Sequence, residues 1–234
     1  MFEESSIKLE APHFLCYYIY MKKKVDNFKL VRPLLVKQGL GLLPEDCCCM
    51  VELIGRKKDN PALMKSQQHF GSYFIRKPED LDKYEAEIKW KCGAFNCRAY
   101  INLNPKPLKK IAVNMMHALL EDMETNDFNN IFTTLVSSTA KAGTVKDKKL
   151  FVIDVDDVSS MCEAYEEVKE AVVKCGQLTG PDMLPTVNGM HVLSAPFDCQ
   201  MFNVLVKTFK HCTAEVKHNA PTLLYADLKE SDEE

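Results

Sequence analysis

Runs of apolar residues, interrupted by glycine, proline and acids, divide the chain into short extended segments. Strands are expected at Phe14 to Tyr20, Met50 to Ile54, Ser72 to Ile75 and Ala99 to Leu103, because β-branched and aromatic residues favour strands. The most pronounced run, at 149–156, is apolar until it reaches two aspartates. These segments predict β-sheets.

Stretches between the strands carry the spacing of helices. Pro78 to Lys91 starts with a proline and several acids, which suit the first turn of a helix. From Leu108 to Met123 the apolar residues recur every three or four positions, so this stripe is expected to face the core. A further helix is expected at Phe128 to Ser138, followed by a polar connector at 141–149. The alternation predicts a protein of the mixed α/β (α+β) class.

The C-terminal third is expected to combine a hairpin, a helix and two short strands. Asn188-Gly189 favours a two-residue turn between extended arms. Aspartate is a good N-cap, so a helix is expected from Asp198 to about Lys210. Strands are expected at Ala214 to Val216 and Thr222 to Ala226.

Composition limits the class of protein. The chain has 234 residues, 46% of them hydrophobic and 27% charged, which is enough apolar material for one compact unit of two packed lobes. No apolar run approaches the roughly 20 residues of a membrane helix. Glu3 and Glu4 stand where a secretory signal would be basic, so the ten cysteines are expected to be thiols. We therefore expect a soluble, cytoplasmic protein without a membrane partner.

Charge is distributed unevenly. The formal net charge is −3, but residues 227–234 contribute five acids and one lysine, which leaves the preceding part of the chain at +1. Basic clusters occur at Lys22–Lys24, Arg56–Lys58, Lys106–Lys110 and 141–149. Such clusters attract phosphate, although many are only solvated faces.

Two aspartates at the end of the 149–156 run are the clearest candidates for chemistry. Asp154 and Asp156 are two residues apart on a predicted strand, so both side chains point to one face, about 6.6 Å apart along the chain. Carboxylates held in this way suit Mg²⁺ or Mn²⁺. His191, next to the predicted hairpin, and Glu215, at the end of a later strand, are further candidates.

In order, these segments form a pattern. Phe-Val-Ile-Asp154-Val-Asp156, then Asn-Gly-Met-His191, then Ala-Glu215-Val-Lys-His-Asn219-Ala-Pro-Thr222 resemble the three motifs of the archaeo-eukaryotic primase superfamily. This superfamily includes the primase-polymerases and the polymerase domains of bacterial end-joining ligases. The resemblance covers about residues 148–227, and Glu215 stands where the commoner residue is aspartate.

The resemblance implies a fold. It predicts a single primase-polymerase-like domain at 1–227, with an N-terminal α/β module at about 1–140 as the first lobe. The second lobe, at about 141–227, would be an antiparallel sheet with helices, like an RNA-recognition motif. Residues 228–234 would form a disordered acidic tail that can contact a replication protein.

The resemblance also implies an activity, which is metal-dependent nucleotidyl transfer for primer synthesis or extension on a DNA or RNA template. Asp154, Asp156 and Glu215 would be the catalytic residues and would hold two Mg²⁺ or Mn²⁺ ions. The partners would be nucleoside triphosphates and single-stranded or primed nucleic acid. The remaining site residues fall into two groups. Those implied to contact the nucleotide are His191, Asn219 and Thr222. Those expected to hold the nucleic acid are Arg56, Lys57, Lys58, Lys148 and Lys149.

Two other functions fit parts of the same pattern. The stretch Asp154-Val-Asp156 also resembles the first motif of haloacid-dehalogenase-type phosphatases, in which the first aspartate is a nucleophile and the second a general acid. A primase-like fold without turnover, which binds nucleic acid or acts as an accessory protein, is the alternative from a different class. Metal dependence separates the catalytic hypotheses from this one.

Overall fold

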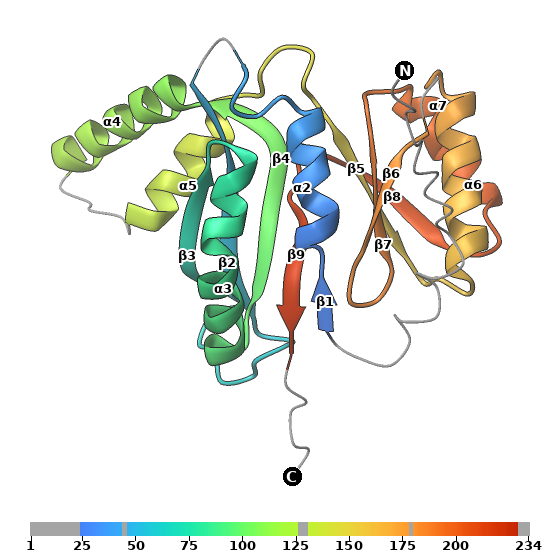
Figure 1. Cartoon of the computed structure of the whole chain (residues 1–234), viewed down its shortest axis with the longest axis horizontal. Helices are drawn as coiled ribbons and strands as arrows, with labels where there is room; N and C mark the ends of the chain where they lie inside the picture. The colour runs from blue at the N-terminus through green and yellow to red at the C-terminus, as the bar shows by residue number, and fades with distance from the viewer. Residues whose placement is uncertain (1–23, 44–45, 126–130, 178–179, 229–234) are drawn as a thin grey trace, which may run out of the picture.

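The computed structural model describes residues 24–43, 46–125, 131–177 and 180–228. The strand expected at Phe14 to Tyr20 and residues 229–234 of the acidic tail lie outside the described residues. Within them the chain forms six α-helices and two antiparallel sheets (Figure 1). The predicted mixed α/β class is therefore confirmed. None of the described helices combines the length and apolar content that crossing a bilayer requires.

The larger sheet has five strands in the order β1-β9-β4-β2-β3. Their bounds are β1 (Lys24–Asp26), β2 (Cys47–Arg56), β3 (Gln67–Ile75), β4 (Arg98–Pro107) and β9 (Thr222–Asp227). β4 continues past Asn104-Pro105, where we expected it to end. A bulge in the pairing of β2 with β4 explains the difference, because a proline without an N–H group is tolerated where the regular ladder is interrupted.

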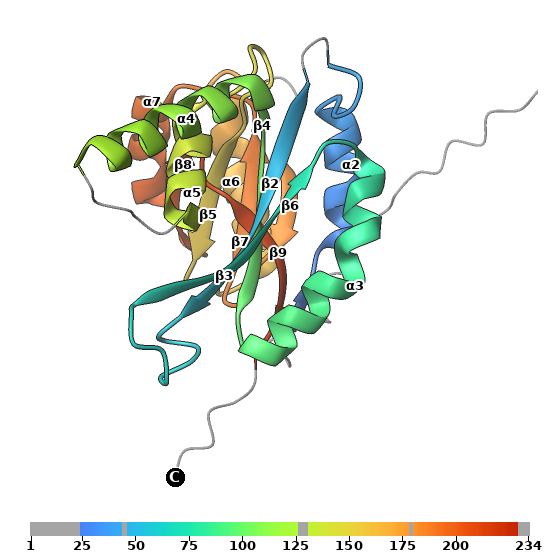
Figure 2. The ribbon, with the colours of Figure 1, turned by 90° about the vertical axis from the view of Figure 1, so that its left-hand side faces the viewer.

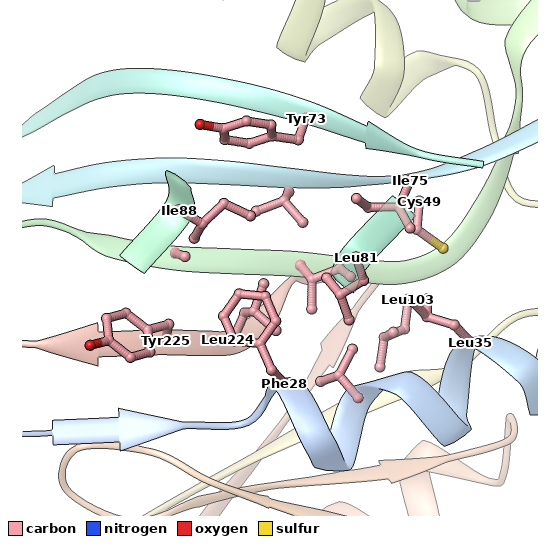
Figure 3. Packing of buried hydrophobic residues seen from close by; sticks show 14 of the residues in the cluster. Phe28, Leu35, Cys49, Tyr73, Ile75, Leu81, Ile88, Leu103, Leu224 and Tyr225 are labelled. Atoms are coloured by element: carbon pink, nitrogen blue, oxygen red, sulfur yellow. The ribbon is translucent and has the colours of Figure 1, made fainter. Parts of the chain in front are cut away.

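Helices α2 (Phe28–Lys37) and α3 (Pro78–Phe95) cover one face of this sheet (Figure 2). Alternate residues of each strand point to the helices. Figure 3 shows this core, in which the labelled residues are Phe28, Leu35, Cys49, Tyr73, Ile75, Leu81, Ile88, Leu103, Leu224 and Tyr225. The intervening residues, such as Glu52 and Arg56 of β2, therefore point to the opposite face.

The smaller sheet has four strands in the order β6-β7-β5-β8. Their bounds are β5 (Phe151–Asp156), β6 (Asp182–Pro185), β7 (Met190–Ser194) and β8 (Thr213–His218). Helix α6 (Met161–Lys174), helix α7 (Cys199–Leu205) and the 3-10 helix η1 (Val206–Thr208) pack on its outer face, where they bury Ile153 and Val155 of β5. Val152 of β5 points the other way and joins the core of the larger sheet. The two sheets thus share apolar contacts.

Strand β9 links the two sheets by topology. We expected this last strand to belong to the second lobe, but it pairs with β4 and β1 in the larger sheet (Figure 1). The chain therefore leaves the smaller sheet at His218, the last residue of β8, and returns to the larger sheet at Thr222. The residues between them lie where the two sheets meet.

Helices α4 (Leu108–Thr125) and α5 (Ile131–Lys141) pack on each other, and α4 extends away from the sheets (Figures 1 and 2). The prediction that the α4 stripe is core is largely wrong. Ile111 is the buried residue of this helix, whereas Met116 and Met123 are each 64% exposed. The periodicity is present, but only the first turns of α4 reach the sheet, so most of the stripe has nothing to pack on within the described residues.

Two local predictions are refined by the structure. The hairpin between β6 and β7 exists, but its loop has four residues, Thr186 to Gly189, instead of two. Asp198 does cap α7, since its Oδ1 accepts hydrogen bonds from the backbone N–H groups of Gln200 and Met201 at 2.9 and 3.0 Å. The helix ends at Leu205 and continues as a 3-10 turn to Thr208, which is shorter than the expected end at Lys210.

Candidate active site

The centre of the candidate site is β5, which lies between β7 and β8. Asp154 is the register partner of His191 on β7 and of Glu215 on β8. Residues opposite each other in an antiparallel pair point to the same face, and Asp156 follows on that face two residues later. The structure thus places the four residues on which the sequence hypothesis depends on one face of the sheet, although no three of their side chains are grouped closely enough to hold a metal ion. Their face is the one turned toward the larger sheet.

His191 is held from both sides of its ring. Its Nε2 lies 3.3 Å from Oδ1 of Asp154, and its Nδ1 lies 2.8 Å from the hydroxyl of Thr222. A carboxylate only accepts, so Nε2 carries the proton toward Asp154; in the neutral ring Nδ1 then accepts from the hydroxyl. Thr222 is 1% exposed, so this hydroxyl has little access to solvent. It orients His191 and does not face the open site.

Asp154 and Asp156 have different electrostatic surroundings. The hydrogen bond from His191, supported by the charges of Lys217 and Arg56, holds the pKa of Asp154 below its usual value. Burial raises the pKa of Asp156, and the negative charges of Asp154 and Asp157 raise it further. The surroundings of Asp156 thus favour its charged form less than those of Asp154 do, and a bound cation would compensate that charge.

Lys217 is a functional candidate that the sequence analysis missed. Its ammonium group forms an ion pair with Glu215, which raises the pKa of Lys217, and it also interacts with the charges of Asp154 and Asp156. The signal was present in the sequence, because Lys217 follows Glu215 by two residues on one strand and so shares its face. In this arrangement Glu215, whose side chain is 71% exposed, is bonded to a lysine.

A cavity of about 420 Å³ lies between the two sheets beside these residues. From the smaller sheet and its hairpin it is lined by Val152, Asp154, Asp156, Thr186, Val187, Asn188, His191 and Lys217. The lining from the larger sheet and its loops is Ile54, Arg56, Lys58, Gln67, Arg98, Tyr100, Ala220, Pro221 and Leu223. Acidic side chains on one wall thus face basic side chains on the other. Such a cavity suits a ligand with several phosphates and bound cations.

The hairpin loop approaches β5 so closely that only glycine fits at its last position. A Cβ atom on Gly189 would lie 2.1 Å from the carbonyl oxygen of Val155, far inside van der Waals contact. The loop is closed by a hydrogen bond from the N–H of Thr186 to the carbonyl of Gly189 at 2.9 Å. Gly189 therefore fixes the wall of the cavity against the strand that carries the two aspartates.

Two arginines on the larger sheet are fixed by neighbours. Arg98 is buried and pairs with Asp59 through two hydrogen bonds of 2.6 and 2.8 Å. Arg56 donates to the hydroxyl of Tyr100 at 3.3 Å. The ion pair with Asp59 occupies the guanidinium of Arg98. Arg56, in contrast, has most of its N–H donors available for a ligand in the cavity.

The remaining predicted residues lie away from the aspartates. Lys148 lies next to Gly39, and Lys149 is over the ring of Phe151 at 5.1 Å; neither is part of the cavity lining, and nor is Lys57. The Oδ1 atom of Asn219 accepts a 2.8 Å hydrogen bond from Lys106. Of the residues predicted to bind nucleic acid, Arg56 and Lys58 are the two that share a cavity with Asp154.

The carboxylates fit the hard cations predicted for them only in part. Asp154 and Asp156 offer oxygen ligands on one face, which is the donor chemistry of Mg²⁺ and Mn²⁺. Within the described residues no three histidine, cysteine, aspartate or glutamate side chains form a group that could hold a metal ion. The ion pair of Glu215 with Lys217 accounts for the missing third ligand. The predicted set of three metal-binding acids stays a prediction.

Comparisons of the chain with protein-family models, with curated proteins and with solved structures give no match. The resemblance to the primase superfamily therefore rests on the sequence motifs alone. Function has to be argued from the chemistry of the site.

Proposed function

We propose that the protein transfers nucleotides from nucleoside triphosphates to a nucleic-acid strand, with Mg²⁺ or Mn²⁺ bound by Asp154 and Asp156. The observation that carries this proposal is the register of β5 with its two neighbours, which aligns both aspartates and His191 on one wall of a cavity. The opposite wall contributes Arg56 and Lys58. A triphosphate brings several negative charges to one place, and nucleotidyl transfer requires mainly that they be positioned and neutralised.

The metal would be held by Asp154 and Asp156, with Glu215 as a further ligand once it is released from Lys217. Bound there, it would activate the attacking hydroxyl oxygen and stabilise charge on the leaving phosphate. Lys217 is suited to pair with the triphosphate, because its long, flexible side chain can move the ammonium group from Glu215 to a phosphate oxygen. His191, oriented by Thr222, would move its Nε2–H hydrogen bond from Asp154 to an oxygen of the triphosphate once the metal occupies Asp154.

The experiment is incorporation of labelled nucleotides on single-stranded and on primed templates, with Mg²⁺ or Mn²⁺. We expect Asp154→Asn and Asp156→Asn to reduce incorporation by about 100-fold or more, because each removes charge that is needed in the transition state. The matched control is Asp182→Asn, which lies on β6 of the same sheet but outside the cavity and pairs with Lys37. Absence of product with the wild-type protein under either metal would refute the proposal.

A protein that binds nucleic acid without turnover is the second candidate, and the Glu215–Lys217 ion pair favours it, since a lysine occupies the third predicted ligand. In this case the wild-type protein would bind single-stranded DNA or RNA equally well with Mg²⁺ or with EDTA. Asp154→Asn would then strengthen binding, because it removes a negative charge that faces the strand. Filter binding at several salt concentrations distinguishes this result from catalysis.

The phosphatase alternative is supported by the pKa shifts of the two aspartates. The pKa of Asp154 is lowered, which suits an ionised nucleophile, and the pKa of Asp156 is raised, which suits a protonated general acid. It predicts release of phosphate from a small monoester such as p-nitrophenyl phosphate, and loss of this release in Asp154→Asn. It also predicts no incorporation of nucleotides. The two assays on the same preparation therefore separate the enzyme hypotheses.

A further inference from the structure

Lys106 is a buried lysine outside the cavity that contains Asp154. It lies near the end of β4, and it is 2% exposed. Its ammonium group donates to Oδ1 of Asn219 at 2.8 Å and to the hydroxyl of Thr144 at 3.4 Å. An ammonium has three N–H donors, so these two neutral acceptors leave one donor for another group.

Within the part of the chain that the structure describes, Lys106 forms no ion pair with an aspartate or glutamate. Its hydrogen bonds go to neutral groups, the amide of Asn219 and the hydroxyl of Thr144. Burial lowers the pKa of Lys106, and the positive charge of Lys149 lowers it further. Burial of a charge without a counter-charge destabilises a protein by several kcal/mol, roughly. An anion bound beside the ammonium group would supply the missing counter-charge.

A small pocket gives an anion access to this position. Its volume is about 140 Å³, well above the roughly 10–15 Å³ that one water molecule needs. It lies against α5, and its lining includes Glu52, Asn102, Lys106, Asn219 and Pro221. Pro221 borders the larger cavity as well. The pocket and the cavity are thus neighbours, separated by the loop between β8 and β9.

The two spaces follow one face of the larger sheet. Tyr100 of β4 lines the cavity, whereas Asn102 and Lys106 of the same strand line the pocket. Tyr100 lies opposite Glu52 and Lys106 opposite Cys48, so the two positions are four residues of β2 apart, about 13 Å, a distance that a few nucleotides of a strand cover. Glu52 also lines the pocket, so its carboxylate limits anion binding to the end where Lys106 lies.

We propose that the Lys106 pocket binds one phosphate group of a nucleic-acid strand that extends from the Asp154 cavity across this face of the sheet. The anion site is inferred from the buried lysine and its pocket alone. That the phosphate belongs to a nucleic acid rests on the proposed function. Lys149 is not part of the pocket lining, but its positive charge acts on Lys106 from outside. A free phosphate-bearing small molecule is the other source of the same chemistry.

The first experiment uses inorganic phosphate and thermal unfolding, with chloride at matched ionic strength as the reference. We expect phosphate to raise the melting temperature of the wild type and of Lys110→Met, a control on an exposed lysine of α4, but not that of Lys106→Met. Without phosphate, Lys106→Met should melt no lower than the wild type, because replacing a buried, unpaired charge with an apolar side chain removes its desolvation penalty.

A second variant keeps the test valid if Lys106→Met folds poorly. Lys106→Gln retains a donor for Asn219 but has no charge. If Lys106 only holds the loop in place, Lys106→Gln responds to phosphate as the wild type does, and the proposal is overturned. If the lysine binds an anion, Lys106→Gln folds and its melting temperature no longer depends on phosphate.

The second experiment identifies the source of the phosphate. Binding of a single-stranded oligonucleotide is measured in EDTA over a range of salt concentrations, without nucleotides. Loss of one phosphate contact in Lys106→Gln should reduce the slope of log K against log salt by about 0.7, whereas Lys110→Met should keep the slope of the wild type. An unchanged slope in Lys106→Gln together with a lost response to inorganic phosphate overturns the nucleic-acid part and assigns the pocket to a free phosphate-bearing molecule.

These outcomes are independent of catalysis. A protein that incorporates no nucleotide but shows the phosphate and salt effects would lose the proposed function and keep the pocket. A protein that incorporates nucleotides without either effect would keep the function and lose the pocket.

Discussion

The Thr222 hydroxyl and His191 Nδ1 are 2.8 Å apart, although the two residues belong to different sheets. Thr222 is the first residue of β9 in the larger sheet, and His191 lies on β7 of the smaller one. The orientation of the imidazole relative to Asp154 therefore depends on how the two sheets pack. This dependence gives a physical reason for the return of the C-terminal strand to the first sheet.

Replacement of Thr222 by valine should disturb His191 without opening a cavity, because valine has nearly the shape of threonine. We expect Thr222→Val to reduce nucleotide incorporation by about 10- to 100-fold, in line with the loss of a group that orients a functional histidine. The free energy of unfolding should fall by about 1 kcal/mol for the lost hydrogen bond. Steady-state kinetics and urea denaturation measure the two effects.

Two controls identify the hydroxyl as the cause. Thr222→Ser keeps the hydroxyl and should retain most of the activity. In the background of His191→Ala, Thr222→Val should have no further effect, because the two residues act as one unit. Full additivity of the two variants would contradict the positioning role.

Strand β5 and its two acids were predictable because every signal there agrees. The apolar run is β-branched and aromatic, it ends at acids, and period two places Asp154 and Asp156 on one face. The same two-residue spacing places Lys217 on the face of Glu215 in β8. We overlooked this lysine because we considered Glu215 only as a metal ligand. Which charges pair across a face depends on neighbouring strands, and local patterns do not specify it.

Long-range packing explains what the sequence analysis missed. The stripe of α4 has the spacing of a core helix, but burial requires an opposing surface, and that surface depends on the direction in which α4 leaves β4. Likewise, nothing in the residues of β9 distinguishes pairing with β4 from pairing with β8. The buried state of Lys106 was also unpredictable, because a lysine in a basic cluster is normally solvated.

Lys217→Met should separate metal binding from nucleotide binding. The substitution releases Glu215 and removes a positive charge close to Asp154 and Asp156, so we expect Mn²⁺ to bind about two- to fivefold more tightly in the absence of nucleotide. The KM for the nucleoside triphosphate should rise by about tenfold or more, since a charged hydrogen-bond donor to phosphate is lost. Calorimetry with Mn²⁺ and initial-rate kinetics provide the two measurements.

A second lysine–glutamate pair supplies the control. Lys174 on α6 pairs with Glu170 at 3.5 Å, on the outer side of the smaller sheet, and Lys174→Met should change neither quantity. Weaker binding of Mn²⁺ by Lys217→Met would show that Glu215 does not become a ligand.

Gly189→Ala tests how the hairpin positions β5. The added methyl group would collide with the backbone of Val155, and backbone cannot move aside as a flexible side chain can. We expect a loss of about 1–3 kcal/mol in the free energy of unfolding and a larger fractional loss of activity than of folded protein. Gly180→Ala is the control, because no atom lies within 4 Å of the position that its methyl group would occupy. Equal stability of the two variants would refute the close approach.

Glu52 should make the stability of the protein depend on pH in an unusual direction. Burial raises the pKa of this carboxyl above its usual value. His69 is 3.9 Å from it, but burial lowers the pKa of His69, so the imidazole is neutral at pH 7 and does not compensate the charge. The folded protein consequently holds the Glu52 proton to a higher pH than the unfolded chain does, in which the pKa is about 4.3.

The sign follows from proton binding. Between the unfolded and the folded pKa the native state binds more protons, so this residue's contribution to the free energy of unfolding falls as pH rises. Glu52→Gln removes the titration. Its stability relative to the wild type should therefore be near its lowest value at pH 4 and increase until the pH exceeds the folded pKa of Glu52. Urea denaturation from pH 4 to 8 measures the difference, with Glu124→Gln on the exposed end of α4 as control. A difference in stability between Glu52→Gln and the wild type that stays constant, or decreases, as pH rises would contradict this prediction. It would mean that Glu52 is ionised in the native state at no electrostatic cost, and that the surface facing Lys106 is more polar than its burial implies.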